Sequence, residues 1–165
     1  MSWSGAEVSA LAAKAARGAG APAGQAALFG QAAALHLQQG RGAGALAEAL
    51  ETLPEGPIMD LPLVLQEALP VARSGGEIDV VWAGDVALAW SYLETMPYRC
   101  DVELERPGGL KVRFSPRSDA RPRAQRISGC EELLHKMATL AAKTLVPDSA
   151  ASRSGGAGAG LTDND

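Results

Sequence analysis

Two runs of alternating side chains, one on each side of a Pro-Gly-Gly tripeptide, constrain the fold of this chain more than any other feature. The first run, Arg99–Glu105, alternates acidic with apolar residues, and the second, Leu110–Phe114, alternates apolar with basic residues. Successive side chains of a strand point to opposite faces of a sheet. The pattern therefore predicts an antiparallel hairpin with one apolar face and one charged face.

Charge predicts the register of this hairpin. A two-residue turn would place an acidic residue opposite an apolar one and would mix the two faces. A three-residue loop, Pro107–Gly109, pairs Glu105 with Lys111 and Glu103 with Arg113. Because a one-residue slip inverts the faces of a strand, we expect the three-residue loop. Each opposite-charge pair then contributes about 0.2–1 kcal/mol.

Helical spacing of apolar residues dominates the chain before this hairpin. The first helix starts at a capping box formed by Ser4 and Glu7 and ends at a Gly-rich turn. The second runs from about Pro22 to Gln39, and the third from about Ala43 to Leu53. A fourth is expected from Leu61 to about Ala72, with Asp60 as its cap.

Two segments nearer the hairpin are less uniform. Gly84-Asp85 separates two apolar runs and fits a two-residue hairpin turn, but the Ala- and Leu-rich residues 85–94 also fit a helix, and both alternatives stay open. After a polar connection, Ser128 and Glu131 form a second capping box. It predicts a helix from Gly129 to about Leu145.

This order of elements predicts an α+β fold with about four N-terminal helices, a small antiparallel sheet and a long C-terminal helix. We expect one domain over residues 1–165. Its helical part covers 4–73, the sheet-containing part 76–128, the last helix 129–146 and a Gly-rich tail 147–165.

Composition narrows the possible environments and partners. The net charge of -4 does not favour nucleic-acid binding, and no apolar run approaches the roughly 18 residues of a membrane span. The N-terminal residues lack the pattern of a signal peptide, so we expect a cytoplasmic protein. A basic stretch within residues 111–126 is either a solvated face or a surface for anions or acidic partners.

The two histidines, His36 and His135, lie in predicted helices without the spacing of a zinc motif. We expect His135 to face solvent. Arg41 follows the end of the helix that carries His36. Either His36 is only a favourable charge at a helix C-terminus, or it lines a polar pocket together with Arg41.

The Gly-rich tail is either a ligand- or metal-binding segment or a flexible coil. Exposed amides of Gly156, Gly158 and Gly160 could form an anion-binding concavity. Hard oxygen ligands suited to Mg²⁺ or Ca²⁺ are present in Asp163, Asn164 and Asp165. Gly- and Ser-rich termini also behave as flexible coils, so composition alone favours disorder.

Residues 7–37 and 144–165 resemble the two ends of an uncharacterised bacterial family, known as domain of unknown function 3726. The shared segments are Ala-Ala-Arg-Gly-Ala-Gly near the start and Gly-Ala-Gly-Ala-Gly-Leu before Asp-Asn-Asp at the end. The matching residues are Arg17, Gly18, Gly20, Pro147, Ser149, Ser152, Arg153, Gly156, Gly158, Gly160, Asp163, Asn164 and Asp165. The resemblance implies no reaction and no cofactor, but it implies that the tail is an ordered feature. The central region is shorter than expected of the family.

Three functions follow as hypotheses, and the sequence does not decide whether the protein is an enzyme or what its oligomeric state is. The first is binding of a small anionic ligand. The residues assigned to it are Arg17, His36, Arg41, Ser149, Ser152, Arg153, Gly156, Gly158 and Gly160. The second is a metal-dependent enzyme that uses the tail carboxylates. The third is a non-catalytic subunit that binds partners through its Ala-rich helices or its basic stretch.

Overall fold

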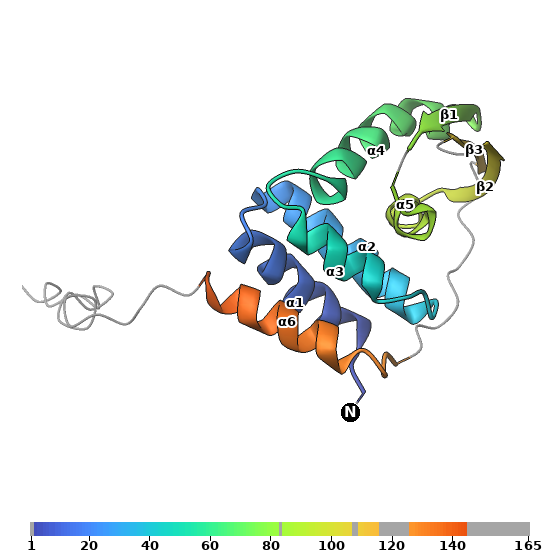
Figure 1. Cartoon of the computed structure of the whole chain (residues 1–165). Helices are drawn as coiled ribbons and strands as arrows, with labels where there is room; N and C mark the ends of the chain where they lie inside the picture. The colour runs from blue at the N-terminus through green and yellow to red at the C-terminus, as the bar shows by residue number, and fades with distance from the viewer. Residues whose placement is uncertain (1, 83, 107–108, 116–125, 145–165) are drawn as a thin grey trace, which may run out of the picture.

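A computed structural model shows a mostly helical α+β protein, with a layer of helices beside a small antiparallel sheet (Figure 1). The structure describes residues 2–82, 84–106, 109–115 and 126–144. The predicted Gly-rich tail lies outside these residues. The last helix ends within them, at Ala142, which is earlier than the predicted end near Leu145.

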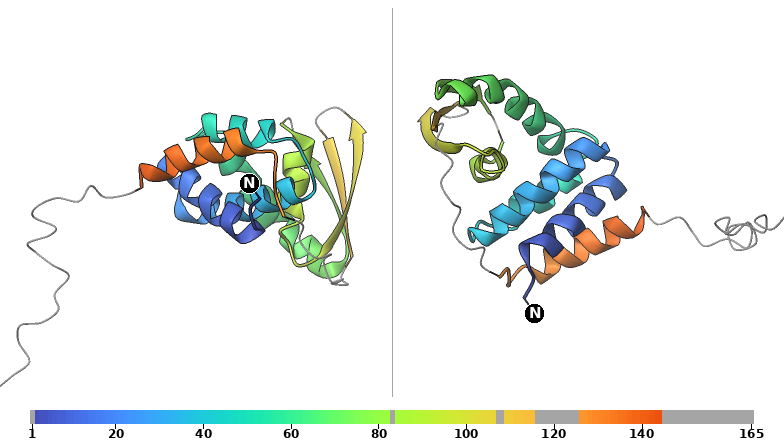
Figure 2. Two further views of the ribbon diagram at one scale, coloured as in Figure 1. Left: turned by 90° about the horizontal axis from the view of Figure 1, so that it is seen from below. Right: turned by 180° about the vertical axis from the view of Figure 1, so that it is seen from behind.

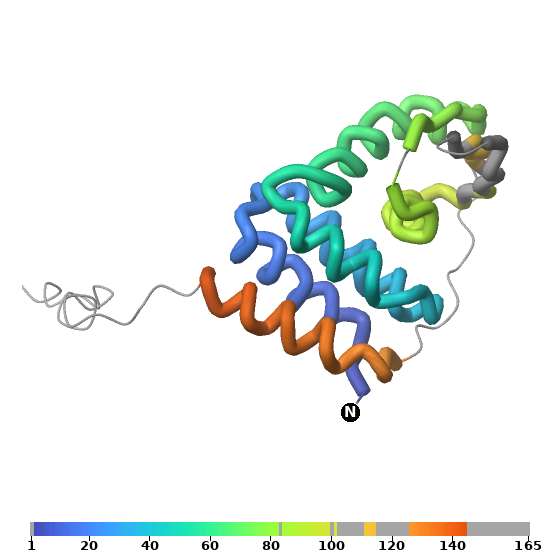
Figure 3. The backbone as a smooth tube through the Cα atoms, viewed as in Figure 1, coloured from blue at the N-terminus to red at the C-terminus, as the bar shows by residue number. Residues whose placement is uncertain are grey.

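Three helices form the layer, with α1 (Gly5–Gly18) in the middle, α2 (Ala23–Gln38) on one side and α6 (Glu131–Ala142) on the other (Figures 1 and 2). The short helix α3 (Gly44–Glu51) lies beside them and buries two leucines and an alanine. The tube in Figure 3 shows that the first and last of these helices run side by side although they come from opposite ends of the described chain.

The start of α1 confirms the first predicted capping box. The backbone N–H of Glu7 donates to Ser4 Oγ at 3.2 Å, and the backbone N–H of Ser4 donates to Glu7 Oε2 at 2.7 Å. Four residues of this helix are buried, three of them alanines. An alanine face lets helices approach closely, so the low aromatic content of 4% is matched by tight packing of small side chains.

Two glycines make the closest helix contacts possible. A Cβ atom at Gly18 would overlap the backbone carbonyl of Leu140 in α6. A Cβ atom at Gly30 in α2 would press on the backbone of Ser9 in α1. Gly18, the last residue of α1, therefore allows α1 and α6 to cross closely. The turn that follows requires a positive φ, which Gly20 adopts at 109°.

The fourth helix, α4 (Pro57–Ser74), begins earlier than predicted. Gly56, not Asp60, occupies the N-cap position, and Pro57 takes the first helical position. Proline suits that position because its missing N–H would have no helical partner and its φ is already helical. Asp60 instead lies in the first turn, where a negative charge favours the helix dipole.

Residues 85–94 resolve to the helical alternative. Helix α5 (Val86–Leu93) starts where Asp85 Oδ1 accepts a hydrogen bond from the backbone N–H of Leu88 at 2.6 Å. The strand before it, β1 (Glu77–Val81), pairs with a later strand and forms no hairpin with residues 86–90. Asp85 is thus the N-cap of a helix and not part of a two-residue hairpin turn.

The predicted hairpin forms from β2 (Arg99–Arg106) and β3 (Gly109–Ser115), but its predicted register is wrong by two residues. Glu103 lies opposite Lys111, and Asp101 lies opposite Arg113. The pairing shifts between Leu104 and Arg106, so β2 has one residue more than β3 at this point. Because a shift of two residues still places acidic positions opposite basic ones, the alternating charges cannot distinguish the two registers.

The sheet has the order β1-β3-β2, and both pairings are antiparallel. Val112 and Phe114 of β3 are buried on the inner face, together with Val80 of β1. Lys111 and Arg113 lie in the middle strand of the outer face, between acidic residues of both neighbouring strands.

The second capping box is wrong. Helix α6 begins at Glu131, and its N-cap is Cys130, which makes no side-chain capping bond. Gly129 has a positive φ of 75°, so the backbone turns here and the helix starts two residues later than predicted. His135 is exposed, as expected. At the end of the polar connection, Ile127 forms a single antiparallel bridge with Trp3.

In the described part of the chain, none of the helices combines the length and the apolar character that crossing a bilayer requires.

Candidate functional site

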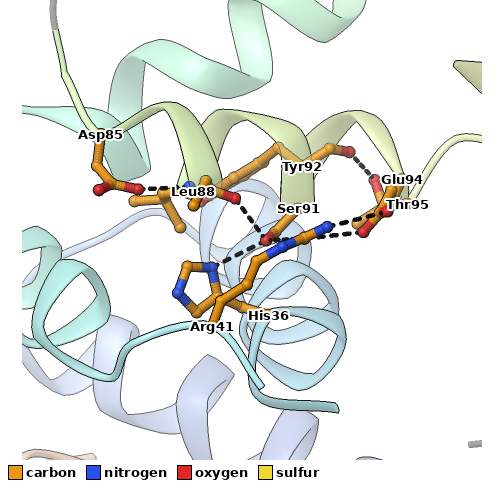
Figure 4. Close-up of polar contacts among 9 residues, drawn as sticks. His36, Arg41, Asp85, Leu88, Ser91, Tyr92, Glu94 and Thr95 are labelled. Carbon is orange, nitrogen blue, oxygen red and sulfur yellow. Dashed lines mark hydrogen bonds and ion pairs between the residues drawn. The ribbon is translucent and has the colours of Figure 1, made fainter. Parts of the chain in front are cut away.

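A buried polar cluster lies where the helical layer meets α5 (Figure 4). It contains His36 from the last turn of α2, Arg41 from the segment after that helix, and Ser91 and Glu94 from α5 and its end. His36 and Ser91 are completely buried. Segments about 50 residues apart in sequence are therefore joined by polar side chains.

Hydrogen bonds define the state of the histidine. His36 Nε2 lies 2.9 Å from the carbonyl oxygen of Gly42, and a carbonyl can only accept, so Nε2 carries a hydrogen. Nδ1 lies 2.9 Å from Ser91 Oγ. In a neutral ring Nδ1 is the acceptor, so it shares the single hydrogen of the Ser91 hydroxyl with the carbonyl oxygen of Ala87, which lies 2.8 Å from Ser91 Oγ. Arg41 Nη1 donates to Ser91 Oγ at 2.6 Å.

Arg41 has a second partner, the acidic residue Glu94. Its Nη1 and Nη2 donate to the two carboxylate oxygens of Glu94 at 2.8 Å and 3.0 Å, and its guanidinium lies 5.5 Å from the centroid of the Trp90 ring. The exposed fractions of the two charged side chains are 16% and 28%. The charge expected to receive an anionic ligand is therefore already neutralised within the protein.

Burial lowers the pKa of His36, chiefly because the charged ring would lose its hydration, and nearby Arg41 acts in the same direction. The hydrogen bond to Gly42 opposes this effect. The ring is thus neutral near pH 7 and adds no positive charge to the end of α2. A Ser–His pair that is wholly buried and bonded to main-chain carbonyls has no access to substrate, so we interpret the cluster as a structural tie.

Acid should destabilise the protein through His36. The unfolded chain binds a proton near pH 6.5, whereas the buried ring binds it only at lower pH. The stabilisation is complete above about pH 6.5 and is lost as pH falls toward the lowered pKa, with a slope of up to about 1.4 kcal/mol per pH unit. Urea unfolding between pH 5 and 8 measures this slope, and we expect His36→Gln to flatten it.

The matched control is His135→Gln, which removes an exposed imidazole from α6 and leaves the buried ring in place. A profile that stays equally steep in His36→Gln would show that another group is responsible.

An open groove of about 350 Å³ lies beside the cluster, between the first half of α1 and the second half of α2. Its apolar surface comes from short side chains and one leucine, and four uncharged polar side chains line it. The lining residues are Gly5, Ala6, Ser9, Gln31, Ala34, Leu35, Gln38 and Thr95. Gln38 is two residues from His36, and Thr95 follows Glu94, so the cluster fixes part of the groove wall.

A second, much smaller cavity of about 10 Å³ lies between α4, β1 and α5. Tyr92 lines it, and this side chain is completely buried. Among the residues that the structure describes, its hydroxyl has no hydrogen-bond partner. Burial raises the pKa of this phenol far above its ordinary value. The volume is about that of one water, but the other lining side chains are aliphatic, so the space offers water too few partners.

The structure separates the predicted ligand-binding residues. His36 and Arg41 come together, but Arg17 is exposed in the last turn of α1. The groove and the cluster lie toward the other end of that 14-residue helix, which is roughly 20 Å long. The remaining predicted residues lie outside the described part. They are Ser149, Ser152, Arg153, Gly156, Gly158, Gly160, Asp163, Asn164 and Asp165.

The described part of the basic stretch is bonded internally. Arg113 forms an ion pair with Glu77, and Lys111 lies 3.7 Å from the same carboxylate. Arg126 donates to the hydroxyl and carbonyl oxygens of Ser2, each at 2.8 Å. These contacts favour the interpretation as a solvated face over that of an anion-binding surface.

Sequence reasoning missed Ser91, Glu94 and the groove residues. One signal was available, since Glu94 is the first charged residue after Asp85 in an otherwise apolar helical segment. Such a charge needs a partner when the helix is largely buried. Ser9, Gln31 and Gln38 carry no comparable signal, because polar residues on helices are usually solvated.

Comparisons with family models, curated proteins and solved structures find no match to this chain. The resemblance to domain of unknown function 3726 stays a prediction.

Proposed function

We propose that this protein binds a small uncharged molecule in the groove between α1 and α2. The observation that carries the proposal is the lining, in which four neutral hydrogen-bonding side chains surround an alanine and leucine surface within about 350 Å³. That volume lies at the lower end of the range for small-molecule sites. An apolar surface with a few polar groups is also the usual composition of such sites.

The lining favours a neutral ligand over the anion expected from sequence. Neither acidic nor basic side chains line the groove in the described residues. The nearby N-terminus of α1 is already compensated by the Glu7 carboxylate, and Arg41 is committed to Glu94. Extra negative charge would therefore gain little from either group.

The hydrogen-bonding groups suggest amides and hydroxyls as ligand functions. Gln31 and Gln38 each offer a donor and an acceptor. The hydroxyl of Thr95 already donates to the carbonyl of Tyr92 at 2.7 Å, so it is left to accept. A compact amide, polyol or nucleoside matches this set. Contributions from Ser152 and Arg153 belong to the same proposal, and deletion of residues 151–165 tests them.

The experiment is an NMR screen of uncharged amides, polyols and nucleosides, with small carboxylates as a comparison set. We expect a neutral compound to shift the side-chain amide signals of Gln31 and Gln38. The variant Ala6→Trp fills the groove from an exposed position on α1 and should abolish the shifts. The control Ala10→Trp places the same ring on an exposed position that does not line the groove, and should preserve them.

Two results would overturn the proposal. The first is a screen in which only charged compounds shift these amides. The second is Ala6→Trp binding the same compound as tightly as the unmodified chain.

A further inference from the structure

Strand β1 forms one edge of the sheet, and its backbone pairing shows which groups face outward. Phe114 N donates to Gly76 O at 3.0 Å, which makes this a hydrogen-bonded pair. Such pairs alternate along an antiparallel ladder, so Ile78 and Val80 bond to β3. The N–H and C=O groups of the residues between them, at positions 77, 79 and 81, therefore point away from β3, toward the edge that has no neighbouring strand among the described residues.

The side chains at these three positions lie on the outer face of the sheet. Glu77, Asp79 and Val81 are all exposed, and Val81 is 87% exposed. The edge thus presents two carboxylates and one aliphatic side chain in a row, beside outward main-chain donors and acceptors. An exposed strand edge is a template for another strand, and proteins usually protect it.

Charge protects this edge against a second copy of the chain. An antiparallel copy of β1 in full register would place Asp79 against Asp79, and a shift by one pair would place Glu77 against Asp79. Like charges directly opposite each other destabilise a strand pair. Asp79 would attract a strand that carries basic residues at alternate positions. Glu77 already pairs with Arg113 and Lys111 and would share its carboxylate with a further basic residue.

We propose that the outer edge of β1 binds an extended segment of a partner that alternates apolar and basic residues. The strand β3 already shows this pattern, because it places Lys111 opposite Asp79 and Arg113 opposite Glu77 along the edge of β1 that is paired. A partner of the same pattern would repeat these pairs on the outer side. An apolar residue next in register would cover Val81. Five residues of strand make a small interface, so the binding is transient.

The test uses a capped peptide that copies the sequence of β3, Gly-Leu-Lys-Val-Arg-Phe-Ser, with valine at the first position to face Val81. Amide hydrogen exchange of the full chain, followed by NMR, is measured with and without the peptide. We expect new protection at the amides of Glu77, Asp79 and Val81. A peptide with glutamates in place of its lysine and arginine should give none.

Variants of the chain separate backbone pairing from charge. Asp79→Pro removes one outward N–H and leaves the ladder to β3 intact, because proline is tolerated at outward positions of an edge strand. Because this substitution also removes the carboxylate, it is compared with Asp79→Asn, and binding should be roughly two- to tenfold weaker than in that variant through the lost hydrogen bond. Asp79→Lys should weaken binding through repulsion. The matched control Asp101→Lys reverses an exposed charge on β2 and should bind as the unmodified chain does.

Three outcomes would overturn the proposal. They are unchanged binding by Asp79→Pro, peptide-induced protection confined to β2, and protection of the β1 edge that grows with protein concentration without peptide. The second outcome would mean that the peptide replaces β3, and the third that a second copy is the partner.

Discussion

The substitution Gly18→Val should lower the free energy of unfolding by about 3 kcal/mol or more. A Cβ atom at Gly18 would overlap the carbonyl oxygen of Leu140, which is main chain and cannot rotate away. The two helices must therefore separate or shift, and α1 loses packing against α6. Overpacking at a well-packed site usually costs 1–3 kcal/mol, and an obstruction by backbone belongs at the upper end.

Urea unfolding followed by circular dichroism measures this loss. The control is Gly24→Ala, another glycine within a helix, where a Cβ atom would meet no atom within 4 Å. It should leave stability unchanged or raise it by about 0.4–1 kcal/mol, because alanine reduces the freedom of the unfolded chain. If valine at position 18 lowered stability by less than about 0.5 kcal/mol, the close approach of α1 and α6 would be wrong.

Arg41→Ala should lower the unfolding free energy by about 2–3 kcal/mol. The substitution removes both guanidinium donors from the Glu94 carboxylate and a donor from buried Ser91. Breaking a fully buried ion pair costs 3–5 kcal/mol, and the partial exposure of both side chains reduces that figure. The lost contact with the Trp90 ring adds to the effect.

A double-mutant cycle with Glu94→Ala isolates the pair, and we expect a coupling energy within the 0.5–3 kcal/mol range of directly bonded residues. Arg41→Lys keeps the positive charge but cannot bond to both carboxylate oxygens in the same way. Its stability should therefore fall between that of the unmodified chain and that of Arg41→Ala. A coupling energy near zero would show that Arg41 acts through packing alone and would contradict the tie between α2 and α5.

Local rules predicted the parts of the fold that local contacts determine. The capping box at Ser4 needs only residues three apart, and it forms as predicted. Alternation also predicts which residues of β3 are buried, and that prediction is confirmed although the predicted register is wrong. The second capping box fails because Gly129 turns the backbone between Ser128 and Glu131. The helix α4 starts earlier than predicted because Gly56-Pro57 fits a loop as well as the start of a helix, and local sequence does not distinguish the two.

The candidate site depends on contacts that no local rule contains. His36 and Arg41 were identified as a pair because they are near in sequence, but their partners Ser91 and Glu94 lie 55 and 53 residues further along. An arginine is available to a ligand only if no carboxylate of the same chain already forms an ion pair with it. The groove likewise forms only when α1 and α2 pack, and its polar residues look like any solvated helix face until then.

The position of α1 in the middle of its layer has a consequence for biosynthesis. One flank of α1 packs on α2, which follows it immediately, but the other packs on α6, more than a hundred residues later. Until residue 142 has left the ribosome, that second flank stays uncovered. The nascent chain therefore exposes one apolar flank of α1 while more than a hundred further residues are made, and exposed apolar surface of this kind favours aggregation unless chaperones cover it.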